Sequence, residues 1–211
     1  LKKLNNMKAV PGKKMTFAAD NLFDNTAHKN LVFEPFFNIH DSRYMMYWLS
    51  MNNADYTKFK TEKENEEKQR IELDRRTIDR IEAGRQQPEA DHAMQTQQSH
   101  RGSHMGESWR DARNGGFFEY RMATNNEMNL SLMVRYWGNE GPNRKFDILV
   151  DGKVLASENI SDKWQRDAFV NVEYKIPAEM LTSKSHVVVR FQSATGTTAG
   201  GIFEVRMLNN K

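Results

Sequence analysis

The sequence has no cysteine among its 211 residues. Disulfide bonds, cysteine-ligated metals and thiol catalysis are therefore excluded for this chain. The sequence also has no apolar run long enough to span a bilayer. Neither sign of charge dominates, because 31 basic residues face 28 acidic ones and the net charge is +3. A nucleic-acid-binding surface needs clustered basic residues, so this balance argues against that function.

The first residues, Leu1-Lys2-Lys3-Leu4, include no initiator Met and lead into no apolar stretch. We expect the chain to be part of a larger protein, so a missing signal peptide carries no information about its compartment. Its 12 Phe, 6 Tyr and 4 Trp supply enough apolar bulk for at least one core.

Residues 1–53 have the pattern of loops and short strands. The predicted strands cover residues 15–18, 31–39 and 43–49, the last of them rich in aromatic side chains. Pro35 places the second strand at an edge or a bend, because proline has no N–H to donate to a neighbouring strand. Three strands make a poor core on their own. We therefore expect residues 1–53 to be the end of an upstream β-sandwich domain.

Residues 54–85 are highly charged and predict a connecting helix. No Gly or Pro occurs between Tyr56 and Glu82. Pairs such as Glu64 and Lys68 have the i,i+4 spacing of a helix, with the acidic residue first, which is the favourable order.

The ends and the apolar face of this helix can also be predicted. Asn53 or Asp55 is expected to cap its start and Gly84 to end it. The apolar stripe is thin, which favours a solvated connector over a coiled coil. Its members are Tyr56, Phe59, Ile71, Ile78 and Ile81.

Residues 86–211 have the alternating pattern of β-strands. Asp151-Gly152 between two apolar runs is a strong hairpin signal. Many short strands with turn residues between them predict a sandwich or jelly roll. The expected fold is therefore mainly β: a jelly-roll or galactose-binding-like β-sandwich, preceded by a long connecting helix and an N-terminal β remnant. The predicted strands cover residues 115–122, 130–137, 146–150, 154–156, 169–174, 187–192 and 202–208.

Several segments resemble a known group of proteins. They are Trp109-Arg110-Asp111-Ala112, Gly115-Gly116-Phe117-Phe118, Val134-Arg135-Tyr136-Trp137-Gly138, Phe146-Asp147-Ile148-Leu149-Val150-Asp151-Gly152 and Ala199-Gly200-Gly201-Ile202-Phe203. Together they look like the C-terminal sandwich of glycoside hydrolase families 127 and 146, which include β-L-arabinofuranosidases. The resemblance extends to Glu34-Pro35-Phe36, His40-Asp41-Ser42-Arg43-Tyr44 and Gln86-Gln87-Pro88-Glu89-Ala90-Asp91-His92.

The resemblance implies a longer polypeptide in which catalysis takes place in a domain other than the β-sandwich. In those families an (α/α)6 barrel carries glutamates and a zinc ion held by cysteines, and β-sandwich domains follow it. None of the cysteines can be placed on this chain. The resemblance therefore implies that the catalytic barrel lies upstream and is the partner of this chain. It further implies a chain that is not an enzyme, holds no cofactor, and is periplasmic or secreted.

Acidic residues and histidines give no convincing catalytic or metal site. A glycosidase needs two facing carboxyl groups, and Glu119 and Glu204 lie in predicted strands with nothing to mark them as a pair. Asp147 and Asp151 lack the dense acidic loop of a calcium site. The remaining candidates for metal ligands are His92, His100 and His104, beside Asp91, but their spacing matches no tight metal site.

Sugar binding is the more informative hypothesis, because carbohydrate modules stack aromatic rings on sugars and bond the hydroxyl groups with polar side chains. Alternation along residues 130–137 places Trp137 and Arg135 on the face opposite the core. We expect Arg190 to share that face, together with Gln192, Glu204 and Arg206. Trp164 and Arg166 lie in a polar stretch expected to be a loop. The five candidate carbohydrate-binding residues are Trp137, Trp164, Arg135, Arg166 and Arg190.

Two structural alternatives stay open for these residues. The aromatic side chains could pack against the helix or the absent barrel. Arg135, Arg190 and Arg206 could instead form ion pairs across neighbouring strands. Their partners would be Glu119, Glu204 or Asp147.

Three functions remain for the chain as a whole. The favoured one is an accessory domain that supports the catalytic barrel of a bacterial glycoside hydrolase acting on arabinose-containing plant glycans. The second is a genuine carbohydrate-binding module with a plant glycan as ligand. The third is a structural or oligomerising piece that associates through the charged helix.

Overall fold

The computed structural model describes residues 7–20, 30–35 and 51–210. It divides into two compact units, Leu1–Glu67 and Lys68–Lys211, and α1 (Asn53–Arg76) contributes to both. None of the helices in the described ranges is long and apolar enough to cross a membrane.

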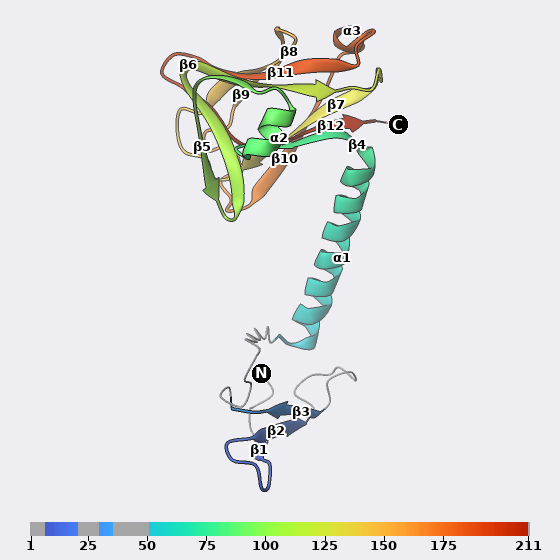
Figure 1. Ribbon diagram of the computed structural model, residues 1–211, viewed down its shortest axis with the longest axis vertical. Coiled ribbons are helices and arrows are strands. Elements are labelled where there is room, and N and C mark those ends of the chain that lie inside the picture. Colours follow the sequence, from blue (N-terminus) through green and yellow to red (C-terminus); the bar gives the residue numbers. More distant parts are fainter. Residues whose placement is uncertain (1–6, 21–29, 36–50, 211) are drawn as a thin grey trace. The chain divides into compact units, whose positions relative to one another are not determined.

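The first unit contains a small antiparallel sheet (Figure 1). Its strands are β1 (Met7–Ala9), β2 (Phe17–Asp20) and β3 (Asn30–Phe33), in the order β1-β2-β3. The predicted strand at residues 15–18 is displaced by two residues, and the prediction for 31–39 is met by β3 as far as Phe33. The strand predicted at 43–49 lies outside the described residues.

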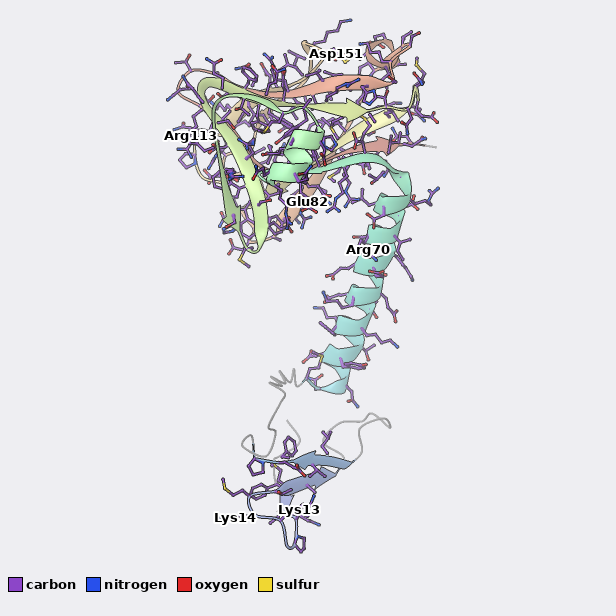
Figure 2. All side chains as sticks on the ribbon, in the orientation of Figure 1. Lys13, Lys14, Arg70, Glu82, Arg113 and Asp151 are labelled. Carbon is purple, nitrogen blue, oxygen red and sulfur yellow. The ribbon has the colours of Figure 1, made fainter. Side chains whose placement is uncertain are left out.

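Helix α1 confirms the predicted charged helix as far as Arg76. Within α1, which is described in full, no residue is buried, and its side chains project from the whole circumference (Figure 2). Asn52, rather than either predicted residue, caps its start, because its Oδ1 accepts the Asp55 N–H at 2.9 Å.

The predicted end of this helix is wrong. It stops at Arg76, and β4 (Thr77–Glu82) follows directly and pairs with a distant strand, β12 (Thr198–Asn209). The β-branched side chains of Thr77, Ile78 and Ile81 suit a strand. Ile81 is fully buried in the core, which a solvated helix would not allow.

The second unit is a β-sandwich, as predicted. Every strand pairing in it is antiparallel. Its other elements are α2 (Gln86–Asp91), β5 (Gln95–His104), β6 (Glu107–Ala123), β7 (Leu130–Trp137), β8 (Lys145–Val150), β9 (Lys153–Asn159), β10 (Phe169–Lys175), α3 (Ala178–Leu181) and β11 (His186–Ser193).

Two layers enclose the core of this sandwich. In one layer β12 lies between β4 and β7, and β10 pairs with β7; in the other, β11 lies between β6 and β8, and β9 pairs with β8 (Figure 1). The layers are joined because the first half of β12 pairs with β6, which also carries β5 as a neighbour. The core includes Phe118, Leu132, Tyr136, Ile148 and Val189, each fully buried. These residues come from strands of both layers.

All seven strands predicted in residues 86–211 are present as β6 to β12. The predicted hairpin is also confirmed: Asp151 and Gly152 connect β8 and β9 with φ values of 47° and 78°, which a two-residue turn of this type requires. β4 was not predicted, and the polar β5 lies where the sequence fits a polar loop or an edge strand equally well.

Candidate functional site

A surface hollow lies in the second unit beside the end of β7. Its volume is about 370 Å³, within the range of roughly 300–1,000 Å³ that is typical of small-ligand pockets. We call it the Trp137 pocket. Its lining combines aromatic rings, which we call the wall, with the charged pair of Glu140 and Arg144, which we call the floor. The lining residues are Ser103, His104, Trp109, Trp137, Asn139, Glu140, Arg144, Gly201 and Phe203.

Alternation along β7 positions Trp137. Its neighbour Tyr136 is fully buried in the core, so Trp137 projects from the opposite face and is half-buried. The edge-to-face contacts of Trp137 hold its ring in place: the ring centroid lies 4.5 Å from that of His104 and 5.2 Å from that of Phe169. Phe169 in turn packs against Phe203 at 4.9 Å.

The hairpin between β5 and β6 forms one side of the pocket. Met105 and Gly106 make its turn, with φ values of 50° and 84°. Glu107 anchors this turn to β7, because Arg135 Nε and Nη2 donate to its two carboxylate oxygens at 2.9 and 2.8 Å. The pocket wall is therefore tied to the strand that carries Trp137.

Glycine in β5 allows Trp109 to take its place in the wall. A Cβ atom at Gly102 would lie 2.5 Å from Cζ2 of the Trp109 ring. The ring therefore rests directly on the backbone of β5, and a larger residue at position 102 would displace it.

The floor of the pocket is a paired carboxylate and guanidinium. Arg144 Nε lies 3.0 Å from Glu140 Oε2, and Arg144 Nη1 donates to the Gly200 carbonyl oxygen at 2.8 Å. Glu140 is only 9% exposed. Burial raises the pKa of its carboxyl group, and Arg144 and the Gly201 N–H offset part of that rise.

Gly201 keeps the floor accessible. A Cβ atom at this position would lie 3.4 Å from Glu140 Oε1 and 3.6 Å from both Phe203 and Trp109. The absence of a side chain therefore leaves space between the carboxylate and the aromatic wall.

A second carboxylate, Asp111, is completely buried behind the floor. Arg113 donates two hydrogen bonds to its Oδ2, at 3.1 and 2.9 Å, and Arg144 lies 3.8 Å from the same atom. Oδ1 has no well-directed hydrogen bond within the described part of the chain, although His100 Nδ1 is 3.3 Å away. The Arg144 guanidinium therefore lies near two carboxylates, those of Asp111 and Glu140.

The five predicted carbohydrate-binding residues have different surroundings. Trp137 lines the pocket. Arg135 lies beside it, stacked on Phe169 with 4.4 Å between its Cζ and the ring centroid, and engaged by Glu107. Arg166 is an exposed residue of the loop before β10 and is not among the lining residues.

The other two candidates lie elsewhere. Trp164 stacks on Tyr136, with 5.7 Å between the ring centroids and 27° between the planes, and packs on the core. Trp164 therefore packs within its own sandwich, whereas the packing alternative named the helix or the absent barrel as the surface it would contact. Arg190 lies on β11, in the layer opposite β7, so the expectation that it shares a face with Trp137 is wrong.

The ion-pair alternative across neighbouring strands is confirmed for Arg190, whereas Arg206 pairs with Glu204 within one strand, β12. Arg190 Nε donates to Glu119 Oε2 at 2.6 Å, across the register of β11 and β6. Arg206 Nε donates to Glu204 Oε1 at 2.7 Å. Glu119 and Glu204 thus belong to separate arginine pairs.

The histidines and the candidate calcium ligands also lie apart. His92 contacts Asp79, His100 lies near Asp111, and His104 packs on Trp137. Asp147 accepts a hydrogen bond from Ser157, and Asp151 accepts one from Lys184. No group of three potential metal ligands occurs among the residues that the structure describes.

Sequence reasoning did not find most of the pocket. It missed His104, Trp109, Glu140, Arg144, Gly201 and Phe203. Trp109, Gly201 and Phe203 lie in the segments that carried the family resemblance. That resemblance was the only sequence feature that could have pointed to these three residues. Glu140 and Arg144 lie in the loop after β7, where nothing in the sequence marks them.

Comparison with known families gives an assignment. One family model matches residues 72–208, well over half of the chain. The chain belongs to DUF6805, a family of unknown function. Residues 2–50 match a further model, DUF4986, a domain of unknown function. No curated protein shows significant similarity to the chain.

Solved structures with similarity to the chain include three carbohydrate-binding modules. The first is a family 35 module from Clostridium thermocellum (14% identity, 55% of this chain and 92% of that chain, TM-score 0.42). The second is the C-terminal CBM6 of LamC from Zobellia galactanivorans (13%, 62% and 98%, TM-score 0.42). The third is CBM35 from Paenibacillus barcinonensis (13%, 62% and 98%, TM-score 0.40).

Proposed function

We propose that the chain is a non-catalytic carbohydrate-binding module and that the Trp137 pocket is its ligand site. The observation that carries this proposal is the position of a half-buried tryptophan beside a paired carboxylate and guanidinium, in one hollow of about 370 Å³.

The two halves of the pocket suit the two kinds of surface on a sugar. The C–H face of a sugar ring packs on an aromatic ring such as that of Trp137. Its hydroxyl groups can donate to Glu140 and accept from Arg144 or Asn139. The orientation of the Asn139 amide is fixed, because its Nδ2 donates a hydrogen bond to Asp167 at 2.8 Å. A fixed amide can bond a sugar hydroxyl without first being ordered.

The acidic groups of the pocket support binding without hydrolysis. Glycoside hydrolysis uses two carboxyl groups on opposite sides of the scissile bond. Among the described lining residues only Glu140 carries a carboxyl group, and Asp111 is buried behind the floor.

We further propose that the module serves a glycoside hydrolase. The support is the resemblance of its motifs to the C-terminal region of glycoside hydrolase families 127 and 146. The comparisons with known proteins do not identify these two families. In this proposal an (α/α)6 barrel on the same polypeptide cleaves an arabinose-containing plant glycan outside the cytoplasm, and the module adds affinity for that glycan. The sequence of the complete polypeptide tests this, since it should contain a helical barrel with paired glutamates and a cysteine cluster.

Binding itself is tested with a glycan array that displays neutral and acidic plant oligosaccharides, followed by calorimetric titration of the hits. Trp137→Ala should remove binding, because the stacking surface is lost. Tyr56→Ala is the matched control, since Tyr56 is an exposed aromatic residue of α1 outside the pocket. Absence of any hit, or hits that survive Trp137→Ala, would contradict the proposal.

A further inference from the structure

The turn at the tip of the β5–β6 hairpin has an unusual residue for its backbone geometry. Met105 and Gly106 form a two-residue loop between the paired residues His104 and Glu107, with φ values of 50° and 84°. Loops of this kind strongly favour Asn, Asp or Gly at the first position, because other side chains are strained at positive φ. Methionine at position 105 therefore costs stability.

The hairpin between β8 and β9 shows which residues such a turn normally uses. Its Asp151 and Gly152 have nearly the same φ values, 47° and 78°. The Asp151 carboxylate accepts hydrogen bonds from the Val188 N–H at 2.8 Å and from Lys184 Nζ at 2.7 Å. Methionine has no carboxylate for such bonds and does not favour positive φ. The turn itself therefore gives no reason for Met105.

Packing within the protein does not account for Met105 either. Its exposed fraction is 73%, the highest of any large apolar side chain in the described part of the chain. A Cβ atom at the adjacent Gly106 would meet nothing within 4 Å, so the tip borders open space. A residue that is both strained and exposed, with no gain inside the fold, points to a contact with another molecule.

The position of the tip indicates what that molecule is. His104, on one side of the turn, lines the Trp137 pocket and packs on the Trp137 ring. Glu107, on the other side, accepts two hydrogen bonds from Arg135. The turn is thus fastened to the strand that carries the pocket, and the tip lies at the margin of the second unit (Figure 1). Met105 itself is not among the lining residues, so it lies past the mouth of the pocket.

Resting on the proposed function, we infer that the ligand is a glycan of at least two sugar units and that Met105 contacts the unit next to the one in the Trp137 pocket. The flexible thioether side chain packs on the apolar C–H surface of this second sugar. Because the hairpin is already held on β7, little order has to be imposed on it when the glycan binds.

The test compares disaccharides with methyl glycosides of the same sugar. The 211-residue chain is titrated calorimetrically with arabinobiose and methyl arabinofuranoside, with galactobiose and methyl galactoside, and with xylobiose and methyl xyloside. For the sugar that the pocket accepts, the disaccharide should bind roughly four- to fifteenfold more tightly, as expected from the burial of one or two methylene groups.

The Met105→Asn variant separates this contact from a role in the fold, because its two effects have opposite signs. Asn adopts positive φ readily, so the midpoint of thermal unfolding should rise by roughly 2–4 °C. The disaccharide affinity should fall to within about twofold of that of the methyl glycoside, which itself should not change. A residue with only a structural role would not lose affinity while the fold gains stability.

Two further variants serve as controls. Met105→Leu keeps an apolar side chain of similar volume and keeps the strain of the turn. It should retain the disaccharide affinity to within about threefold and give no gain in stability. Met128→Asn changes another exposed methionine of the same unit, just before β7 and so at the end of that strand remote from Trp137. It should leave every affinity unchanged, and circular dichroism verifies that each variant is folded.

The outcomes separate the inference from the proposed function. Trp137-dependent binding in which disaccharides gain nothing over methyl glycosides would overturn the inference and leave the binding function standing. The same holds if Met105→Asn leaves the disaccharide affinity unchanged, or if it weakens both kinds of probe equally. If neither the array nor these sugars give binding, the proposed function and the inference fall together.

Discussion

The ion pairs of α1 and those inside the β-sandwich use the same residue types in opposite surroundings. In the pair of Lys60 and Glu64 the side chains are 63% and 56% exposed. In the pair of Arg110 and Glu89 they are 8% and 2% exposed. An exposed pair gains little, because water solvates the separated charges nearly as well. Removing one partner of a buried pair is costly, because the other partner is then an uncompensated charge in the interior.

The buried pair is part of a fully bonded cluster around Glu89. Arg110 Nε and Nη2 donate to its carboxylate at 2.5 and 2.6 Å. The Tyr120 hydroxyl and the Gly84 N–H donate to Oε1 at 3.0 and 2.7 Å. Burial raises the pKa of Tyr120, which keeps its hydroxyl a donor. The cluster thus fastens α2 and the turn after β4 to β6.

Loss of Glu89 should have the largest effect on stability. Glu89→Ala leaves the Arg110 guanidinium buried without its carboxylate and the Gly84 N–H without its acceptor. We expect the free energy of unfolding to fall by about 3–5 kcal/mol, measured by urea denaturation followed by tryptophan fluorescence. Glu89→Gln should lose less, because its amide oxygen still accepts hydrogen bonds. A loss below about 1 kcal/mol for Glu89→Ala would show that buried and exposed pairs do not differ as argued.

The sequence predicted those parts of the fold in which a local pattern decides the outcome. Leu132, Val134 and Tyr136 are alternate residues of β7 and all three are fully buried in the core. The Asp151-Gly152 pair strongly favours a two-residue turn. Residues 77–82 have no such pattern, because their charges suit a helix as well as a strand. These residues form a strand because they pair with β12, more than a hundred residues away. The spacing of residues in the sequence does not reveal such a distant pairing.

The same reasoning explains what could be predicted of the site. Trp137 was found because strand alternation fixes which way it points. Trp164 was misplaced because its neighbours Lys163 and Gln165 are polar, which hides the stacking of its ring on Tyr136. The floor depends on contacts between the loop after β7 and the start of β12, which only the folded chain brings together.

The pair of His92 and Asp79 lies between the two extremes of burial. The His92 and Asp79 side chains are 14% and 19% exposed, with 3.0 Å between Nε2 and Oδ1. His92 Nδ1 lies 2.7 Å from the Pro88 carbonyl oxygen. Both ring nitrogens therefore face acceptors, which is the arrangement of a protonated imidazole. The hydrogen bond to Asp79 raises the pKa of His92 above 6.5. Burial alone would raise the pKa of Asp79, but hydrogen bonds from His92 and the Ala123 N–H lower it overall.

The pH dependence of stability follows from these directions. A raised folded pKa contributes stability that is complete below the unfolded value and is lost as the pH rises through the folded value. The contribution of His92 should therefore be full below pH 6.5 and decline at higher pH, while that of Asp79 is lost only as the medium becomes strongly acidic. The stability difference between the unaltered chain and His92→Gln should shrink by roughly 1 kcal/mol between about pH 6 and pH 8.5. His186→Gln, at an exposed histidine, is the control, and a constant difference for His92→Gln would contradict a charged His92.

The smallest effect should come from the exposed pair on α1. Lys60 precedes Glu64, which is the less favourable order against the helix dipole. A double-mutant cycle with Lys60→Ala and Glu64→Ala, read from the thermal loss of helical circular dichroism, should give a coupling energy of no more than about 0.5 kcal/mol. This coupling should vanish in 1 M salt, because solvent reaches both side chains, whereas the cost of Glu89→Ala should barely change. A coupling above about 1 kcal/mol would mean that α1 is covered by a partner in solution, and light scattering would then show an assembly larger than the monomer.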